Sequence, residues 1–243
     1  MEIIQCKDYN EASKVAGEIL SNAILAKPNI VLGLATGSSP IGIYNTLIND
    51  YKNHKISFKD VKTYNLDEYV GLDRDCPQSY YYFMNEHLFD HIDIKKENVH
   101  IPYADPSQLE ESCKKYSEQL EKTTVDIQLL GIGANGHIGF NEPKTSFDQK
   151  TFIVHLTEKT REDNKRFFNS LDEVPTKAIT MGIKEIMNAK KIVLIATGKN
   201  KAEAMKKLLS GEITTDFPAS ILHKHKDVVV VTDEEALSLV KSL

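Results

Sequence analysis

Short apolar runs rich in β-branched residues alternate along the chain with longer segments in which apolar residues recur at helical spacing. Continuous apolar runs of this kind are typical of strands buried on both faces of a mostly parallel sheet. They predict strands over residues 30–35, 61–66, 125–132, 178–181, 191–197 and 228–232. The helical spacing predicts helices over residues 11–25, 40–51, 79–89, 106–121, 199–209 and 234–243.

This alternation predicts an α/β fold with a doubly wound, mostly parallel sheet and helices on both faces, a Rossmann-like architecture. Residues 152–156 also have an extended pattern, but they come after a proline-containing loop, so we place them outside the main sheet. Because no linker, repeat or low-complexity segment divides the chain, residues 1–243 are expected to form one domain. In open α/β sheets ligands bind beyond the carboxyl ends of the strands.

The formal net charge of −5 argues against a general attraction to nucleic acid or to an anionic membrane. The three cysteines, Cys6, Cys76 and Cys113, are widely spaced and odd in number, which indicates reduced thiols rather than a metal or redox pair. No apolar stretch approaches the roughly 20 residues that a membrane helix needs, and the N-terminal residues have no signal-peptide pattern. We therefore expect a cytoplasmic protein.

A glycine- and hydroxyl-rich segment, residues 33–40, comes directly after the first predicted core strand. Pro40 suits the first turn of the next helix, and Ser38 or Ser39 can cap it. Thr36, Gly37 and these two serines can surround a phosphate, because free backbone N–H groups point outward at a helix N-terminus. The segment lacks the Gly-Lys-Ser/Thr of a Walker loop. An ordinary capped strand–helix turn remains an equal alternative on this segment alone.

The next predicted strand ends in two adjacent acids, Asp67 and Glu68. Packing does not explain charge at this position, because a carboxylate there must be hydrated or paired. Either acid can act as a general base whose pKa is tuned by partial burial. A solvated acidic turn is the alternative.

A glycine-rich segment, residues 129–143, overlaps and extends beyond the predicted strand 125–132. It fits the dinucleotide pattern G-x-G-x-x-G, but that pattern must open a helix, and Gly139 and Pro143 would break a helix at this position. We therefore reject a nucleotide cofactor. The segment is instead predicted to be a loop that presents Asn135, His137 and Glu142 together. Histidine is the usual proton-transfer residue near neutral pH, and an amide or carboxylate can fix its tautomer.

Two segments carry a resemblance to a known family: Asn-Leu-Asp-Glu-Tyr-Val-Gly-Leu at 65–72 and Gly-His-Ile-Gly-Phe-Asn-Glu-Pro at 136–143. Together they resemble the signature segments of the glucosamine-6-phosphate deaminase family. The similarity extends to residues 33–40, 79–89, 160–168 and 197–202, in order and with small gaps. It implies a sugar-phosphate isomerase type of fold and the conversion of glucosamine 6-phosphate and water to fructose 6-phosphate and ammonia, with no metal or other cofactor.

The resemblance also implies roles for individual residues. His137 opens the sugar ring, Asn135 and Glu142 orient and tune its imidazole, and Asp67 moves a proton from carbon 2 to carbon 1. The implied substrate-binding residues are Thr36, Gly37, Ser38, Ser39, Gly136, Arg166 and Lys201. Arg166 offers a planar fork to the phosphate and Lys201 a point charge.

One residue departs from part of the family, in which some members carry aspartate where this chain has Asn135. An amide can still hold His137 by a hydrogen bond, but it adds no charge to raise the pKa of the imidazole. Two other activities remain open at this point: a 6-phosphogluconolactonase with His137 as the base, and a non-catalytic sugar-phosphate sensor. Neither requires a carbon-acid base at Asp67.

The longer, hexameric members of the family are activated by N-acetylglucosamine 6-phosphate through basic residues in the strand after the Phe-Asn-Glu-Pro loop and through a C-terminal extension. Phe152 and Val154 stand where those basic residues are expected, and the chain ends at Leu243, after the last predicted helix. An apolar pair cannot bind a phosphate. The resemblance therefore implies a non-allosteric enzyme, a monomer or small homo-oligomer with a phosphosugar as its small-molecule partner.

Overall fold

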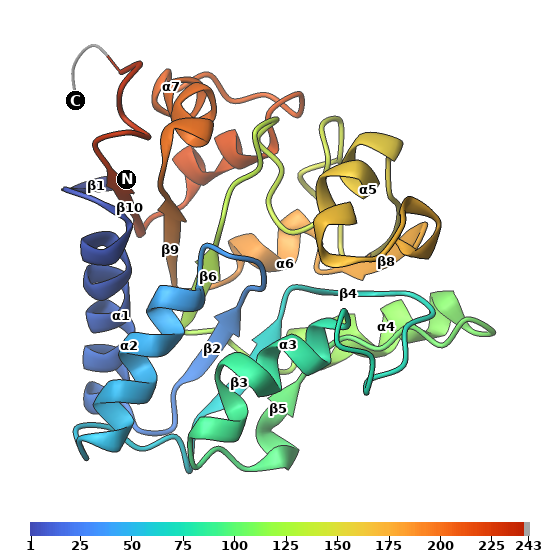
Figure 1. Ribbon diagram of the computed structural model, residues 1–243, viewed down its shortest axis with the longest axis horizontal. Helices are drawn as coiled ribbons and strands as arrows, with labels where there is room; N and C mark the ends of the chain where they lie inside the picture. The colour runs from blue at the N-terminus through green and yellow to red at the C-terminus, as the bar shows by residue number, and fades with distance from the viewer. Residues whose placement is uncertain (241–243) are drawn as a thin grey trace.

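The computed structural model describes residues 1–240 and contains one large parallel sheet (Figure 1). Seven strands lie in the order β1-β10-β9-β6-β2-β3-β5, and every neighbouring pair is parallel. Their bounds are β1 Glu2–Cys6, β2 Val31–Leu34, β3 Lys62–Asn65, β5 Val99–His100, β6 Ile127–Leu130, β9 Lys191–Ala196 and β10 Val228–Asp233. The α/β prediction is confirmed.

Helices cover both faces of this sheet. On one face, α1 (Tyr9–Ala26), α2 (Ile41–Lys52) and α3 (Tyr80–His87) pack in one apolar cluster; on the other, α4 (Leu109–Glu121), α6 (Ile183–Met187) and α7 (Ala202–Leu209) pack in a second. Successive residues of a central strand enter opposite clusters, as Val193 and Leu194 of β9 show. This two-sided burial explains why the central strands have continuous apolar sequences rather than alternating ones.

A second, antiparallel sheet has the order β4-β8-β7, with β4 at Asp67–Tyr69, β7 at Phe152–His155 and β8 at Lys177–Thr180. The chain passes from β3 into β4 through Leu66, whose backbone bonds to Leu34 of the large sheet and to Met181 after β8. The placement of 152–156 outside the main sheet is confirmed. The placement of 178–181 inside it is wrong, because an apolar run reveals burial but not the strand it pairs with.

Two further expectations about elements need correction. Residues 234–239 form turns rather than a helix, because the backbone bonds from Ser238 to Glu235 and from Val240 to Leu237 span three residues, although the bond from Leu237 to Asp233 spans four. Residues 241–243 lie outside the described part. The sequence pattern also gave no strand at β1, β4 or β5 and no helix at α5 (Glu158–Asn164) or α6. These elements are short, edge-located or largely polar, so their hydrophobic periodicity is weak.

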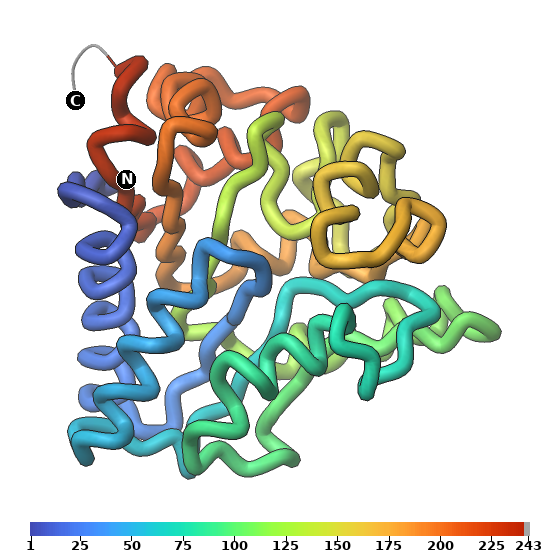
Figure 2. Tube along the Cα trace, viewed as in Figure 1, coloured from blue at the N-terminus to red at the C-terminus, as the bar shows by residue number. Residues whose placement is uncertain are grey.

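The chain reverses its direction of travel across the sheet at β2. From β2 it moves to β3 and β5 on one side, then returns to β6, β9 and β10 on the other. The loops that leave β2 and β6 therefore diverge at the carboxyl edge, which is the position at which open α/β sheets bind ligands. Figure 2 shows α1 and the segment around α5 on opposite sides of the molecule, with these loops between them.

Candidate active site

Asp67 and Glu68 are neighbours on β4 and are both buried, at 7% and 5% exposure, but their surroundings differ. Glu68 accepts three backbone N–H bonds, from Tyr69 at 2.8 Å, Tyr80 at 3.0 Å and Tyr81 at 2.9 Å. Two of these donors belong to the first turn of α3, so Glu68 stabilises the N-terminus of that helix. The carboxylate of Glu68 is therefore engaged in holding the backbone, and its role is structural.

Among the described residues, no group donates a hydrogen bond to the carboxylate of Asp67. Burial, followed by the nearby charge of Glu68, raises the pKa of Asp67 to about 8. With its pKa this close to neutral pH, the carboxyl group can both release and take up a proton, and its ionised form is a stronger base than an ordinary carboxylate. Asp67 also faces the loop after β6, since its Oδ2 lies 3.7 Å from the point where a Cβ on Gly139 would stand.

The loop after β6, residues 131–143, contains no helix, as the positions of Gly139 and Pro143 predicted. Its glycines allow close packing: a Cβ on Gly133 would stand 2.1 Å from the ring of His137. Gly136 has a φ of +83° and lies against the ring of Phe217, so it requires both the left-handed conformation and the missing side chain. Buried Asn141 bonds to the carbonyls of Ile138 and Met181, which anchors the loop to the small sheet.

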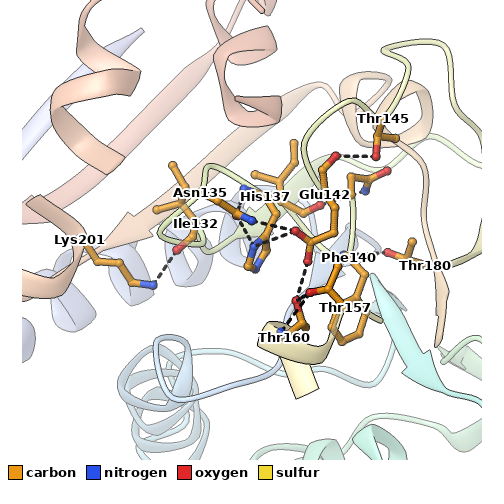
Figure 3. Close-up of polar contacts among 12 residues, drawn as sticks. Ile132, Asn135, His137, Phe140, Glu142, Thr145, Thr157, Thr160, Thr180 and Lys201 are labelled. Carbon is orange, nitrogen blue, oxygen red and sulfur yellow. Dashed lines mark hydrogen bonds and ion pairs between the residues drawn. The ribbon is translucent and has the colours of Figure 1, made fainter. Parts of the chain in front are cut away.

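His137, Asn135 and Glu142 are hydrogen bonded in series (Figure 3). The amide Oδ1 of Asn135 lies 2.7 Å from His137 Nδ1 and accepts the backbone N–H of His137 at 3.2 Å, while its Nδ2 donates to Glu142 Oε2 at 2.8 Å. Because Oδ1 can only accept, Nδ1 carries the imidazole proton. Nε2 then has the free lone pair, which is the form a general base requires.

Burial and nearby charges act on the pKa of His137 in opposite directions. Partial burial lowers it, Glu142 raises it from 4.0 Å away, and Lys201 lowers it further, so the pKa lies below its ordinary value. The side chain remains 32% exposed. The imidazole is therefore neutral near pH 7 and accessible to a ligand.

The loop after β2 places Thr36, Gly37, Ser38 and Ser39 at the same edge of the sheet as the His137 loop. Within residues 1–240, the backbone N–H groups of these four residues form no hydrogen bond. The hydroxyls of Thr36, Ser38 and Ser39 form none in this part of the chain either. Tyr9 fixes the loop from outside, bonding to the carbonyls of Ser38 and Ser39. Such a set of free donors before a helix suits an anion.

The expected serine cap of α2 is not formed. Pro40 itself occupies the capping position, no side chain caps the helix, and the backbone N–H of Ile41 instead bonds to the carbonyl of Ser38 at 3.4 Å. Gly37, with a φ of +92°, turns the loop so that the serine hydroxyls do not reach the first helical turn. The hydroxyls remain available to a ligand.

Lys201 and Arg166 approach this edge from two different segments. Lys201, just before α7, donates at 2.7 Å to the carbonyl of Ile132, in the loop after β6. Burial and then the charge of Arg166 lower the pKa of Lys201, and the charge of Lys201 acts in turn on His137. Exposed Arg166 stacks over the ring of Phe167 at 4.7 Å. The charges of Lys201 and Arg166 thus act on one another, and the charge of Lys201 acts on His137.

Thr160 is a member of the site that the sequence pattern did not indicate. Its hydroxyl donates to Glu142 Oε1 at 3.0 Å across 18 positions of sequence. An isolated threonine on a polar helix carries no sequence signal, because its role depends on the fold that brings α5 to the loop.

A cavity of about 460 Å³ lies elsewhere, between β5 and α4, and is lined by residues that include Arg74, His100, Lys115 and Tyr116. None of the expected site residues lines it. We locate the site by its chemistry rather than by this cavity, because the perturbed acid, the imidazole and the cations all gather at the other location. In the described part of the chain no three His, Cys, Asp or Glu residues are grouped to hold a metal ion, and no helix there could cross a membrane.

The family model of glucosamine-6-phosphate isomerases and 6-phosphogluconolactonases matches residues 9–231. The chain therefore belongs to this family. A glucosamine-6-phosphate deaminase of Thermoanaerobacter sp. (strain X514) is 57% identical over 241 residues, which cover 99% of this chain and 95% of the relative. One of Clostridium novyi (strain NT) is 53% identical over 239 residues, or 98% of this chain and 99% of the relative.

Solved structures agree with the family assignment. A monomeric glucosamine-6-phosphate deaminase superposes with a TM-score of 0.96 at 50% identity, covering 98% of this chain and 100% of the other. A 6-phosphogluconolactonase from Trypanosoma brucei has a TM-score of 0.80 at 18% identity, with 98% of each chain covered. The second likeness shows a shared fold only.

Proposed function

We propose that this protein is a glucosamine-6-phosphate deaminase, which converts glucosamine 6-phosphate and water to fructose 6-phosphate and ammonia. The observation that carries the proposal is the buried Asp67, whose carboxylate has no hydrogen-bond donor among residues 1–240 and whose pKa is raised to about 8 beside the His137 loop. Lactone hydrolysis and sugar-phosphate sensing need no base for a carbon-bound proton. The three similar proteins reported above at 50–57% identity are deaminases, which supports the same choice.

The substrate is a small phosphosugar held by its phosphate. The N–H groups and hydroxyls of Thr36, Gly37, Ser38 and Ser39 donate to its oxygens, with Gly136 close to the sugar and Arg166 and Lys201 supplying positive charge. Charge-assisted donors of this number favour a phosphorylated sugar strongly over the free sugar. We propose that the enzyme works as a monomer or small homo-oligomer, in keeping with the monomeric deaminase that it resembles.

Ring opening is the task of His137. Its Nε2 takes the proton of the anomeric hydroxyl and delivers it to the ring oxygen as the bond between carbon 1 and that oxygen breaks. Asn135 holds the reactive tautomer, and Glu142 stabilises the imidazolium that forms transiently. The product of this step is the open-chain amino aldehyde.

Deamination then proceeds through proton transfer by Asp67. Its ionised carboxylate removes the proton from carbon 2 while the ammonium group of the substrate gives a proton to the carbonyl oxygen at carbon 1, which yields a neutral enolamine. Asp67 returns the proton to carbon 1, leaving an iminium at carbon 2. Water adds there and ammonia leaves, which balances the overall reaction. The ammonium group of the bound substrate favours the ionised form of Asp67.

The test is to incubate the purified protein with glucosamine 6-phosphate and to measure ammonia and fructose 6-phosphate in equal amounts. Parallel samples with 6-phosphogluconolactone, and binding of glucosamine 6-phosphate without turnover, test the other two activities. Equimolar products are expected from the first sample alone. Lactone hydrolysis in place of ammonia release, or binding with no product, would contradict the proposal.

A further inference from the structure

The carboxylate of Glu142 is divided between two donors that come from different parts of the chain (Figure 3). Its Oε2 accepts from Asn135 Nδ2 at 2.8 Å within the same loop. Its Oε1 accepts from Thr160 Oγ1 at 3.0 Å, and Thr160 belongs to α5. With one oxygen bonded on each side, the carboxylate cannot rotate without breaking a hydrogen bond.

The direction of these hydrogen bonds depends on what each group can donate. A carboxylate only accepts, so the hydroxyl proton of Thr160 points to Glu142. The oxygen of Thr160 lies 3.0 Å from the hydroxyl of Thr157, which must then be the donor. Thr157 Oγ1 also accepts the backbone N–H of Thr160 at 3.1 Å and so caps α5. Successive hydroxyls thus direct their protons toward the carboxylate.

The segment that holds Thr160 is otherwise tied mainly to itself. None of the residues of α5 is buried, and Arg161 bonds to the carbonyls of Leu171 and Val174, which joins the two ends of the segment. In the described structure the hydrogen bond from α5 to loop 131–143 is the one from Thr160 to Glu142. Arg166 lies in the short turn of helix that follows α5. A phosphate-binding cation and the carboxylate next to His137 are therefore linked through one hydroxyl.

We propose that Thr160 is a positioning residue, which acts on proton transfer by holding the Glu142 carboxylate in place beside His137. The expected effect of Thr160 on turnover rests on the proposed function, whereas its expected effect on the pKa of His137 does not. Glu142 raises the pKa of His137 against the lowering effect of burial. When the Thr160 hydroxyl is removed, the Glu142 carboxylate samples other rotamers and spends less time close to the imidazole. It then stabilises the protonated imidazole less, and the pKa of His137 decreases.

The variants that test this are Thr160→Val, which keeps the shape and removes the hydroxyl, and Thr160→Ser, which retains it. Thr157→Val is the matched control, since it removes the α5 cap but leaves Thr160 able to donate to Glu142. The pKa of His137 is measured by NMR titration of its Cε1–H signal in the ligand-free protein, with His137→Gln used for assignment. Thermal unfolding checks that each variant is folded.

We expect Thr160→Val to lower the pKa of His137 by about half a unit, and Thr160→Ser and Thr157→Val to leave it close to that of the parent protein. With glucosamine 6-phosphate, Thr160→Val should lower kcat about tenfold, as for loss of a hydrogen bond to a charged group, and change KM little. A folded Thr160→Val protein with an unchanged or raised His137 pKa would overturn the proposal, as would an equal shift in Thr157→Val. The titration needs no turnover, so absence of ammonia release in the parent protein would count against the proposed function alone.

Discussion

Asp67 on β4 is 7% exposed and accepts no hydrogen bond from the described residues, whereas His137 in the loop after β6 is 32% exposed at its side chain and bonded to Asn135. The two regions prepare a base in different ways. At Asp67 desolvation strengthens the base by raising its pKa. At His137 a series of hydrogen bonds selects one tautomer and fixes its direction, while the pKa decreases. A strengthened base at Asp67 suits removal of a weakly acidic proton from carbon. A fixed tautomer at His137 suits transfer of a proton from one sugar oxygen to another.

The sharpest test of this comparison is Asp67→Asn, which keeps the shape and removes the base. Ammonia release should fall by about 10²- to 10⁴-fold, the usual contribution of a general base, while substrate binding changes little because a base acts chiefly in the transition state. The measurement is kcat and KM from steady-state ammonia release. A variant that keeps most of its kcat would remove Asp67 from the mechanism.

The same substitution should stabilise the fold, and the sign can be derived from the pKa. The folded protein keeps the Asp67 proton up to about pH 8, but an unfolded chain releases it near pH 3.9. Between these values the folded state binds more protons, so stability decreases as pH rises. Asp67→Asn removes this loss and should raise the unfolding free energy at pH 8 by on the order of 5 kcal/mol, and hardly at pH 4. Glu68→Gln is the contrasting control, since it weakens three backbone hydrogen bonds and should destabilise the protein.

The opposite side of the comparison is tested by His137→Gln. Loss of the imidazole should slow turnover of the closed-ring sugar by about 10²-fold, because ring opening is the only step assigned to it. A 5-deoxy analogue, which lacks the hydroxyl that closes the pyranose ring, bypasses this step. Proton exchange at carbon 2 of that analogue should therefore be almost unaffected. Equal losses on both compounds would show that the assignment is wrong.

Sequence alone predicted this comparison only in part. Adjacent acids at a strand end and a histidine between glycines signal chemistry, but they do not reveal which acid is unpaired. That depends on the N-terminus of α3 folding back onto Glu68. The meaning of Asn135 was likewise hidden, since its Nδ2 donates to Glu142, a bond that an aspartate could not make. Interactions between distant segments, such as the pairing of β4 with β8, leave no local pattern to read.

A smaller effect is expected from the phosphate-binding cations. Arg166→Ala and Lys201→Ala should each raise KM for glucosamine 6-phosphate by about 10- to 100-fold, as for loss of a hydrogen bond to a charged group. Lys201 also lowers the pKa of His137, so its removal should raise that pKa, whereas the charge of exposed Arg166 acts on the pKa of Lys201. Comparison of the two variants therefore separates phosphate binding from tuning of the imidazole. Use of free glucosamine as readily as its phosphate would contradict the phosphate site.

The last prediction is that addition of N-acetylglucosamine 6-phosphate leaves the rate of ammonia release unchanged. The strand after loop 131–143 is β7, and Phe152 and Val154 pack with Tyr69 and Phe140 in an apolar cluster of the small sheet. An effector phosphate needs charge-assisted donors, and at these two positions it would be desolvated and unpaired. Rates of ammonia release should therefore depend hyperbolically on glucosamine 6-phosphate, with and without the acetylated sugar phosphate. A sigmoidal curve that becomes hyperbolic with this effector would show that an activating site exists despite the apolar strand, in whatever oligomeric state the protein is found.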